Sequence, residues 1–280
     1  MATKGHYHEA TSSTGRQYDV RALGRIVPSD DGFDVARVSD GGVLRIVERD
    51  RARRKPTFEA LGEGGQVVRR LDGRPATSSE ARTWMARVLP LVWRETGMAA
   101  EPRVESIFGR HGFEGVIEEM SRLSGCHASR LYAEALLARH RLPTAALVRL
   151  AAQAGRDAAR GPEDAAAILT AVARQGLPDE ALHDAFADAV RRVPSPAQQG
   201  KALHAWIETG DLSNHALLIL LRTIAGVGSD QGRAGLLVTL AGRQAIGGAA
   251  RDEFRRTASA LRSATYRDRA LAALAEAPTR

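Results

Sequence analysis

The sequence has almost no cysteine, and this excludes one way of stabilising a fold. Its single cysteine is Cys126, so the chain can form no internal disulfide bond. A reducing compartment is the default environment of such a chain, and the N-terminal segment lacks the apolar stretch typical of a signal peptide. We therefore expect a cytoplasmic protein.

Long apolar runs are missing as well. The densest run, "ALLILL" at residues 216–221, is far shorter than the roughly 18 residues that a membrane-spanning helix needs. We therefore expect no membrane span. The chain has 280 residues, of which 44% are hydrophobic, and this is enough apolar material for a substantial core.

Aromatic residues make up only 5% of the chain, and only Lys4, Lys55 and Lys201 are lysines. Few aromatic rings leave few platforms on which single-stranded nucleic acid could stack. The net charge of +7 instead favours nucleic-acid binding, because a basic surface attracts phosphate groups. Since acidic and basic residues are mixed along the whole chain, we expect no nucleic-acid binding, but a nucleic-acid-binding helical repeat protein stays an alternative.

No catalytic or metal-binding motif emerges from the sequence. Cys126 precedes His127, but adjacent residues of a helix point in different directions and do not form a nucleophile–base pair. His6, His8 and Glu9 lie close together, and a disordered terminal segment explains them better than a metal site. We expect no catalytic residue, no metal and no cofactor.

The first part of the chain has the pattern of a β-structure. Residues 17–76 contain about five short, partly alternating segments separated by glycine- and aspartate-rich turns, which predicts a small antiparallel β-meander. Residues 1–16 are expected to be a disordered tail, and residues 77–122 to be connecting helices. The first of these helices begins after Ser78 or Ser79 and ends at Gly97, with a kink or break at Pro90.

A repeat governs the second part, residues 123–280. Its units are marked by five residues, and successive marks lie 37, 34, 34 and 34 residues apart: Ser124, Gly161, Ser195, Ser229 and Ser263. Apolar or small residues follow seven and eight positions later, as at Leu236 and Leu237, so each mark is expected to cap a helix and precede its buried stripe. A second helix fits in each unit, which predicts an α-solenoid of HEAT-like helix pairs and an α+β fold.

The end of the array allows two interpretations. The segment "ATYRDRALAALAEA" combines an apolar stripe with charged residues, and this favours a polar cap and a monomer. The alternative is an apolar groove beside residues 216–221 that a second copy or a partner helix fills. Burial of Leu218 and Leu221 within their own chain would favour the cap.

The stretches "DVRALGRIVPSDDGFDVARVSDGGVLRIVERD" and "ARTWMARVLPLVWRETG", followed by the serine-marked units, resemble a group of bacterial proteins of unassigned function. Some relatives in that group carry membrane metallopeptidase modules of the β-lactam-sensor type. The resemblance implies a β-rich part followed by a helical array. It does not imply peptidase activity, because this chain has neither an H-E-x-x-H motif nor membrane helices.

These features favour a non-enzymatic protein-interaction or scaffolding module. Five arginines of the second helices are candidates for contacts with an unknown protein or an acidic peptide: Arg191, Arg192, Arg222, Arg255 and Arg256. A solvated face in which acidic residues offset these charges is the competing interpretation. A sensor or hydrolase with a site at the β–helix junction stays a further alternative.

Overall fold

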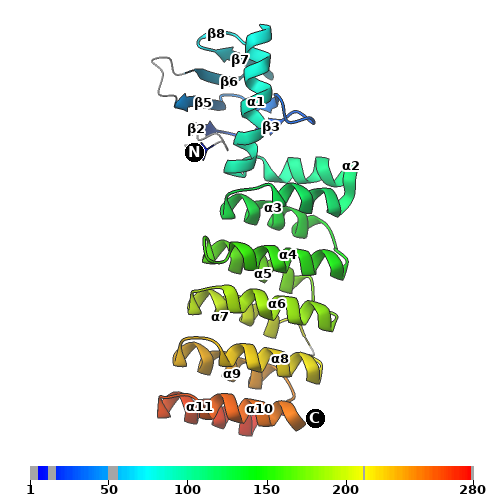
Figure 1. The fold of residues 1–280 in the computed structure, drawn as a ribbon, viewed down its shortest axis with the longest axis vertical. Helices are drawn as coiled ribbons and strands as arrows, with labels where there is room; N and C mark the ends of the chain where they lie inside the picture. The colour runs from blue at the N-terminus through cyan, green and yellow to red at the C-terminus, as the bar shows by residue number, and fades with distance from the viewer. Residues whose placement is uncertain (1–5, 12–16, 50–55, 211, 279–280) are drawn as a thin grey trace. The chain divides into compact units, whose positions relative to one another are not determined.

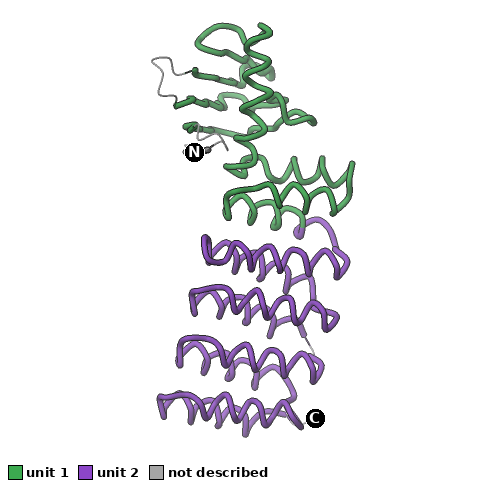
Figure 2. The backbone as a smooth tube through the Cα atoms, viewed as in Figure 1, with its two compact units in different colours: residues 1–136 green, residues 137–280 purple. Residues whose placement is uncertain are grey.

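The computed structural model describes residues 6–11, 17–49, 56–210 and 212–278. It shows an α+β fold in which an antiparallel sheet precedes a succession of helices, as the sequence predicts (Figure 1). The chain divides into two compact units, residues 1–136 and 137–280 (Figure 2). Within the described residues, no helix combines the length and the apolar character needed to cross a membrane.

The first unit holds a six-stranded antiparallel sheet rather than a single five-stranded meander. Its strands, in spatial order, are β1 (His6–Thr11), β2 (Gln17–Leu23), β5 (Val43–Arg49), β6 (Thr57–Glu63), β7 (Gln66–Leu71) and β8 (Arg74–Pro75). Strands β3 (Ile26–Pro28) and β4 (Val35–Val38) pair only with each other and form a separate hairpin. Residues 6–11, which we expected within a disordered tail, form β1 and pair with β2.

One face of the sheet forms the core of the first unit. The side chains of Val20, Ile46 and Phe58 are fully buried, and they alternate along their strands with more exposed residues. Helix α1 (Ser79–Thr96) contributes Trp84 and Trp93 to the same apolar cluster. Helix α1 therefore covers this face of the sheet.

Local residues shape the first two helices of the first unit. Ser78 caps α1 by accepting a hydrogen bond from the amide of Ala81, and Gly97 ends the helix with a φ of 63°. The helix continues through Pro90. Helix α2 (Ala100–Ser121) is interrupted instead at Gly112, where φ is 63° and ψ is −165°.

The helices of the second unit stack in tiers of pairs (Figure 1), and α3 precedes them in the chain. The helices are α3 (Cys126–Arg139), α4 (Thr144–Asp157), α5 (Pro162–Arg174), α6 (Glu180–Arg192), α7 (Pro196–Ile207), α8 (Asn214–Ala225), α9 (Asp230–Arg243), α10 (Gly248–Ser259) and α11 (Ala264–Glu276). In the second unit, α4, α6, α8 and α10 pack in one row, and α5, α7, α9 and α11 pack in another. We call these the second-helix row and the first-helix row.

The repeat frame predicted from the sequence is confirmed at its 34-residue steps. Gly161, Ser195, Ser229 and Ser263 all occupy N-cap positions. The hydroxyls of Ser195 and Ser229 accept hydrogen bonds from backbone amides of the first turn, whereas Ser263 makes no such bond. Ser124 differs, because α3 begins only at Cys126 and the hydroxyl of Ser124 bonds to Glu95.

Candidate functional site

The five arginines singled out from the sequence all lie on the second-helix row. Arg191 and Arg192 end α6, Arg222 lies near the end of α8, and Arg255 and Arg256 lie on α10. All five are exposed. The repeat frame, however, does not align them in one column, because only Arg222 and Arg256 are 34 residues apart.

Three of these arginines are offset by acidic residues of their own helices. Each pairs with a carboxylate one turn earlier: Arg191 with Asp188 at 2.6 Å, Arg255 with Asp252 at 3.3 Å and Arg256 with Glu253 at 2.7 Å. Exposed pairs of this kind contribute little to stability, but they reduce the charge available to a partner. The two candidate arginines of α10, Arg255 and Arg256, are thus largely neutralised.

Arg191, Arg192 and Arg222 lie on α6 and α8, which are adjacent helices of one row. Arg192 and Arg222 have no acidic partner within the described residues. The Nη2 of Arg191 donates to the Oγ1 of Thr223 at 3.4 Å, so the end of α6 lies beside the last turns of α8. The aliphatic stem of Arg192 lies against α4, since a β-carbon at Gly155 would stand 3.3 Å from its Cδ. We call Arg191, Arg192 and Arg222 the α6–α8 arginine cluster.

The first-helix row also carries exposed arginines, but it separates them. Arg174 ends α5 and Arg243 ends α9, and neither has an acidic partner in the described part of the chain. Helix α7 lies between them, and its residue equivalent to Arg174 is the exposed acid Glu208, 34 residues later. Arg174 and Arg243 therefore do not lie on adjacent helices of this row.

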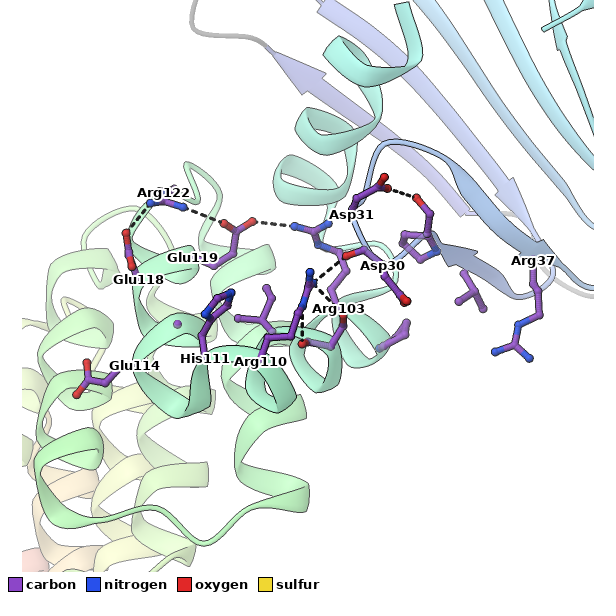
Figure 3. A pocket seen from close by; sticks show the side chains of 17 residues that line it. Asp30, Asp31, Arg37, Arg103, Arg110, His111, Glu114, Glu118, Glu119 and Arg122 are labelled. Atoms are coloured by element: carbon purple, nitrogen blue, oxygen red, sulfur yellow. Dashed lines mark hydrogen bonds and ion pairs between the residues drawn. The ribbon is translucent and has the colours of Figure 1, made fainter. Parts of the chain in front are cut away.

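A cavity of about 590 Å³ opens within the first unit, between the β3–β4 hairpin and α2. Ser29, Asp30 and Asp31 belong to the wall that the hairpin forms, and α2 forms the other wall (Figure 3). Arg110 joins the walls, because its Nη2 donates to the carbonyl oxygen of Asp30 at 2.8 Å and to the Oγ of Ser106 at 3.0 Å. The cavity lies at a β–helix junction, where one of our alternatives expected a site.

A buried carboxylate organises one end of this cavity. Glu119 is only 5% exposed, and its Oε1 accepts hydrogen bonds from the Nε of Arg94 and the Nη2 of Arg103, both at 2.8 Å. Arg103 also donates from its Nε to the hydroxyl of the buried Tyr132 at 2.7 Å. Burial by itself raises the pKa of Glu119, but the hydrogen bonds and charges of the arginines outweigh it and hold this pKa below its ordinary value of 4.5.

The hairpin wall is fixed by its own hydrogen bonds. The Oδ1 of Asp31 accepts from the Ser29 hydroxyl at 2.6 Å and from the amide of Phe33 at 2.9 Å, and the serine bond is the main reason that the pKa of Asp31 is lowered. Gly32 has a φ of 76°, and its carbonyl accepts from the indole of Trp93 at 3.0 Å. The hairpin wall therefore has a defined position beside α2.

The chemistry of the cavity does not favour a particular ligand. Four arginines and five carboxylates line it, so the positive and negative charges of its lining nearly offset one another. Its two serine hydroxyls bond to Asp31 and Arg110 rather than to His111, so the lining forms no nucleophile–base pair. Within the described residues, no group of three or more histidine, cysteine or carboxylate side chains is placed to hold a metal ion.

The sequence signals that Glu119 is buried but not which bonds it makes. The signal was present in "GVIEEM", where Glu119 lies among Val116, Ile117 and Met120, which the structure shows to be buried. An acid at an apolar position of a helix needs basic partners, but nothing local in the sequence identifies Arg94 and Arg103 as those partners.

The fold defines a protein with a β-sheet unit and a helix-pair repeat array. No protein family model, no curated protein and no solved structure matches the chain. The resemblance to bacterial proteins with β-lactam-sensor relatives stays a prediction.

Proposed function

We propose that the protein is a non-enzymatic interaction or scaffolding module that binds an acidic segment of another protein through its second-helix row. The α6–α8 arginine cluster carries this proposal. Two of its guanidinium groups are exposed without an acidic partner among the described residues, and guanidinium binds carboxylates through paired, directional hydrogen bonds.

A helical array suits such a role because stacked pairs present an extended surface built from equivalent positions. The cluster lies on adjacent helices of one row, so a bound segment can contact α6 and α8 together. The proposal favours an acidic peptide over nucleic acid, because the exposed Asp184 and Asp188 of α6 interrupt the positive surface. This disfavours a continuous phosphate backbone more than a short acidic segment.

The proposed setting is the cytoplasm, and the proposed state is a monomer. The single cysteine, Cys126, supports a reducing compartment. A polar outer face on α10 supports the monomer, since an apolar end face would favour stacking with a second copy.

Fluorescence anisotropy with a labelled acidic peptide, such as a dodecamer of alternating Glu and Ser, tests the proposal. We expect the double variant R192A/R222A to weaken binding by about tenfold or more, because hydrogen bonds to charged groups contribute about 1.5–3 kcal/mol each. A Glu-to-Gln peptide of the same length should not bind.

The double variant R174A/R243A is the matched control, because it removes two exposed arginines from helix ends of the first-helix row. It should bind the acidic peptide nearly as well as the native chain. Equal losses in both variants would show that only net charge matters. Tighter binding of duplex DNA than of the peptide at about 150 mM salt would favour the nucleic-acid alternative.

A further inference from the structure

A second pocket of about 330 Å³ lies in the first unit, between the β3–β4 hairpin and the turn that joins β6 to β7. Three valines, Val27, Val38 and Val67, supply its apolar lining. Arg25 and Arg37 also line it. The pocket therefore combines apolar surface with two cationic side chains.

Arg25 and Arg37 form no ion pair within the described residues, although Arg37 also lines the larger cavity. No carboxylate lines this pocket, and neither Arg25 nor Arg37 has an acidic partner in the part of the chain that the structure describes. Val27 is directly opposite Arg37 in the hairpin, and Ser39 bonds through its backbone amide to the carbonyl of Arg25. Side chains opposite each other in an antiparallel pair share a face, so Arg25 and Arg37 lie on the same face of the hairpin.

Ser39 adds a third hydrogen-bond donor. Its hydroxyl oxygen accepts a hydrogen bond from the amide of Arg25 at 3.0 Å, and a hydroxyl that accepts still has a proton to donate. Three glycines hold Ser39 in place, because a β-carbon at Gly24, Gly42 or Gly62 would overlap with its side chain or carbonyl group. The donor is thus fixed before any ligand arrives, which lowers the entropic cost of binding.

We propose that this pocket binds a small organic anion. Its carboxylate or phosphate group is held by Arg25, Arg37 and the Ser39 hydroxyl, and its apolar group packs on the three valines. The volume lies at the lower end of the range for small-molecule sites, about 300–1,000 Å³, so the apolar group is compact. The inference concerns the first unit and does not depend on the function proposed for the helical array.

Titration of the isotope-labelled full chain, followed by ¹H–¹⁵N correlation spectra, tests this inference. The probes are phenylacetate and phenyl phosphate, with 2-phenylethanol as an uncharged probe of similar size. We expect both anions to shift the amide signals of Ser39 and Gly65 saturably, and the tighter probe identifies the preferred anionic group. The alcohol should shift them at least about tenfold more weakly, because it cannot form a charge-assisted bond with guanidinium.

The variants R25Q and R37Q should each weaken binding of the better anion about tenfold. R70Q is the matched control, because Arg70 is an exposed arginine of β7 outside the pocket lining. The native-like spectrum of each variant verifies its fold. The inference is wrong if neither anion shifts Ser39 and Gly65, if the alcohol binds as well as the anions, or if R70Q weakens binding as much as R25Q and R37Q do.

Discussion

Leu221 and Arg255 occupy the same position in successive units, 34 residues apart, yet Leu221 is fully buried and Arg255 is exposed. Two further apolar residues of α8 are replaced by charged ones at the equivalent positions of α10: Leu217 by Arg251 and Leu218 by Asp252. Three apolar positions of α8 are thus charged in α10. A polar outer face is what the last helix of a stacked row requires.

This comparison favours the capped array over the open groove. Leu221 is enclosed by its own chain, as the cap requires, while Leu218 is only half-buried. The cap is therefore supported fully at one of the two test residues and partly at the other.

The first prediction concerns this pair of equivalent residues. Leu221→Ala should lower the free energy of unfolding by about 2–5 kcal/mol, because it leaves a cavity between helices. Arg255→Ala should change it by no more than about 0.5 kcal/mol, since the side chain is exposed. Urea denaturation measures both. Similar losses in the two variants would mean that the repeat frame is misassigned.

The second prediction separates two serines that share the N-cap position. Ser229 accepts a hydrogen bond from the amide of Gly232 at 3.1 Å, whereas the hydroxyl of Ser263 makes no capping bond. Ser229→Ala should therefore cost about 1 kcal/mol. Ser263→Ala should cost clearly less, and thermal unfolding of both variants under one buffer condition checks the difference. A larger loss for Ser263→Ala would contradict the capping geometry.

The third prediction is a pH dependence at Glu119. Because the pKa of Glu119 is lower in the folded chain than its ordinary value of 4.5, the carboxylate stabilises the fold above about pH 4.5. This contribution is lost as the pH falls through the lower, folded-state pKa. Glu119→Gln should therefore cost roughly 3 kcal/mol at pH 7, and the difference from the native chain should shrink as the pH falls below 4.5.

Glu118→Gln is the control for this experiment. Glu118 is the neighbouring carboxylate of α2, it is exposed, and it pairs only with the exposed Arg122. Its variant should have nearly native stability at pH 7. A loss at Glu119→Gln that stays constant from pH 7 to pH 3 would show that packing, and not charge, explains the effect.

The fourth prediction tests the close packing of glycines against Ser39. Gly62→Ala should destabilise the chain by about 1–3 kcal/mol, because the new methyl group overlaps with the Ser39 carbonyl. Gly200→Ala in α7 meets no atom within 4 Å and should be neutral or stabilising, since alanine favours a helix. Chemical denaturation measures the free energy of unfolding of both variants. A neutral Gly62→Ala would show that the backbone around Ser39 rearranges easily.

The parts of the fold that depend on local chemistry were predictable from the sequence. Ser195 and Ser229 mark helix starts because an N-cap serine acts within its own first turn. Strand pairing is different, because it depends on contacts distant in sequence. The alternation of residues 26–38 therefore gave no indication that β3 and β4 leave the main sheet, and residues 6–11 gave none that they join it.

Prediction of the candidate site from the sequence is limited in the same way, because it too depends on contacts between side chains. The sequence located the arginines of α6, α8 and α10, but it did not show which of them are neutralised. That distinction depends on side-chain pairing, such as Arg191 with Asp188, and on the row in which each helix packs. The bonds of Glu119 to Arg94 and Arg103 join residues 25 and 16 positions apart, respectively, so local periodicity does not predict them.

Hydrogen–deuterium exchange with and without the acidic peptide is the most direct test of the central claim, that the second-helix row recognises an acidic segment. We expect slower exchange on peptide binding in the last turns of α6 and α8, which carry Arg191, Arg192 and Arg222. Exchange in α5 and α9 should stay unchanged, although these helices end in Arg174 and Arg243. Protection confined to α5 and α9, or to the first unit, would contradict the claim.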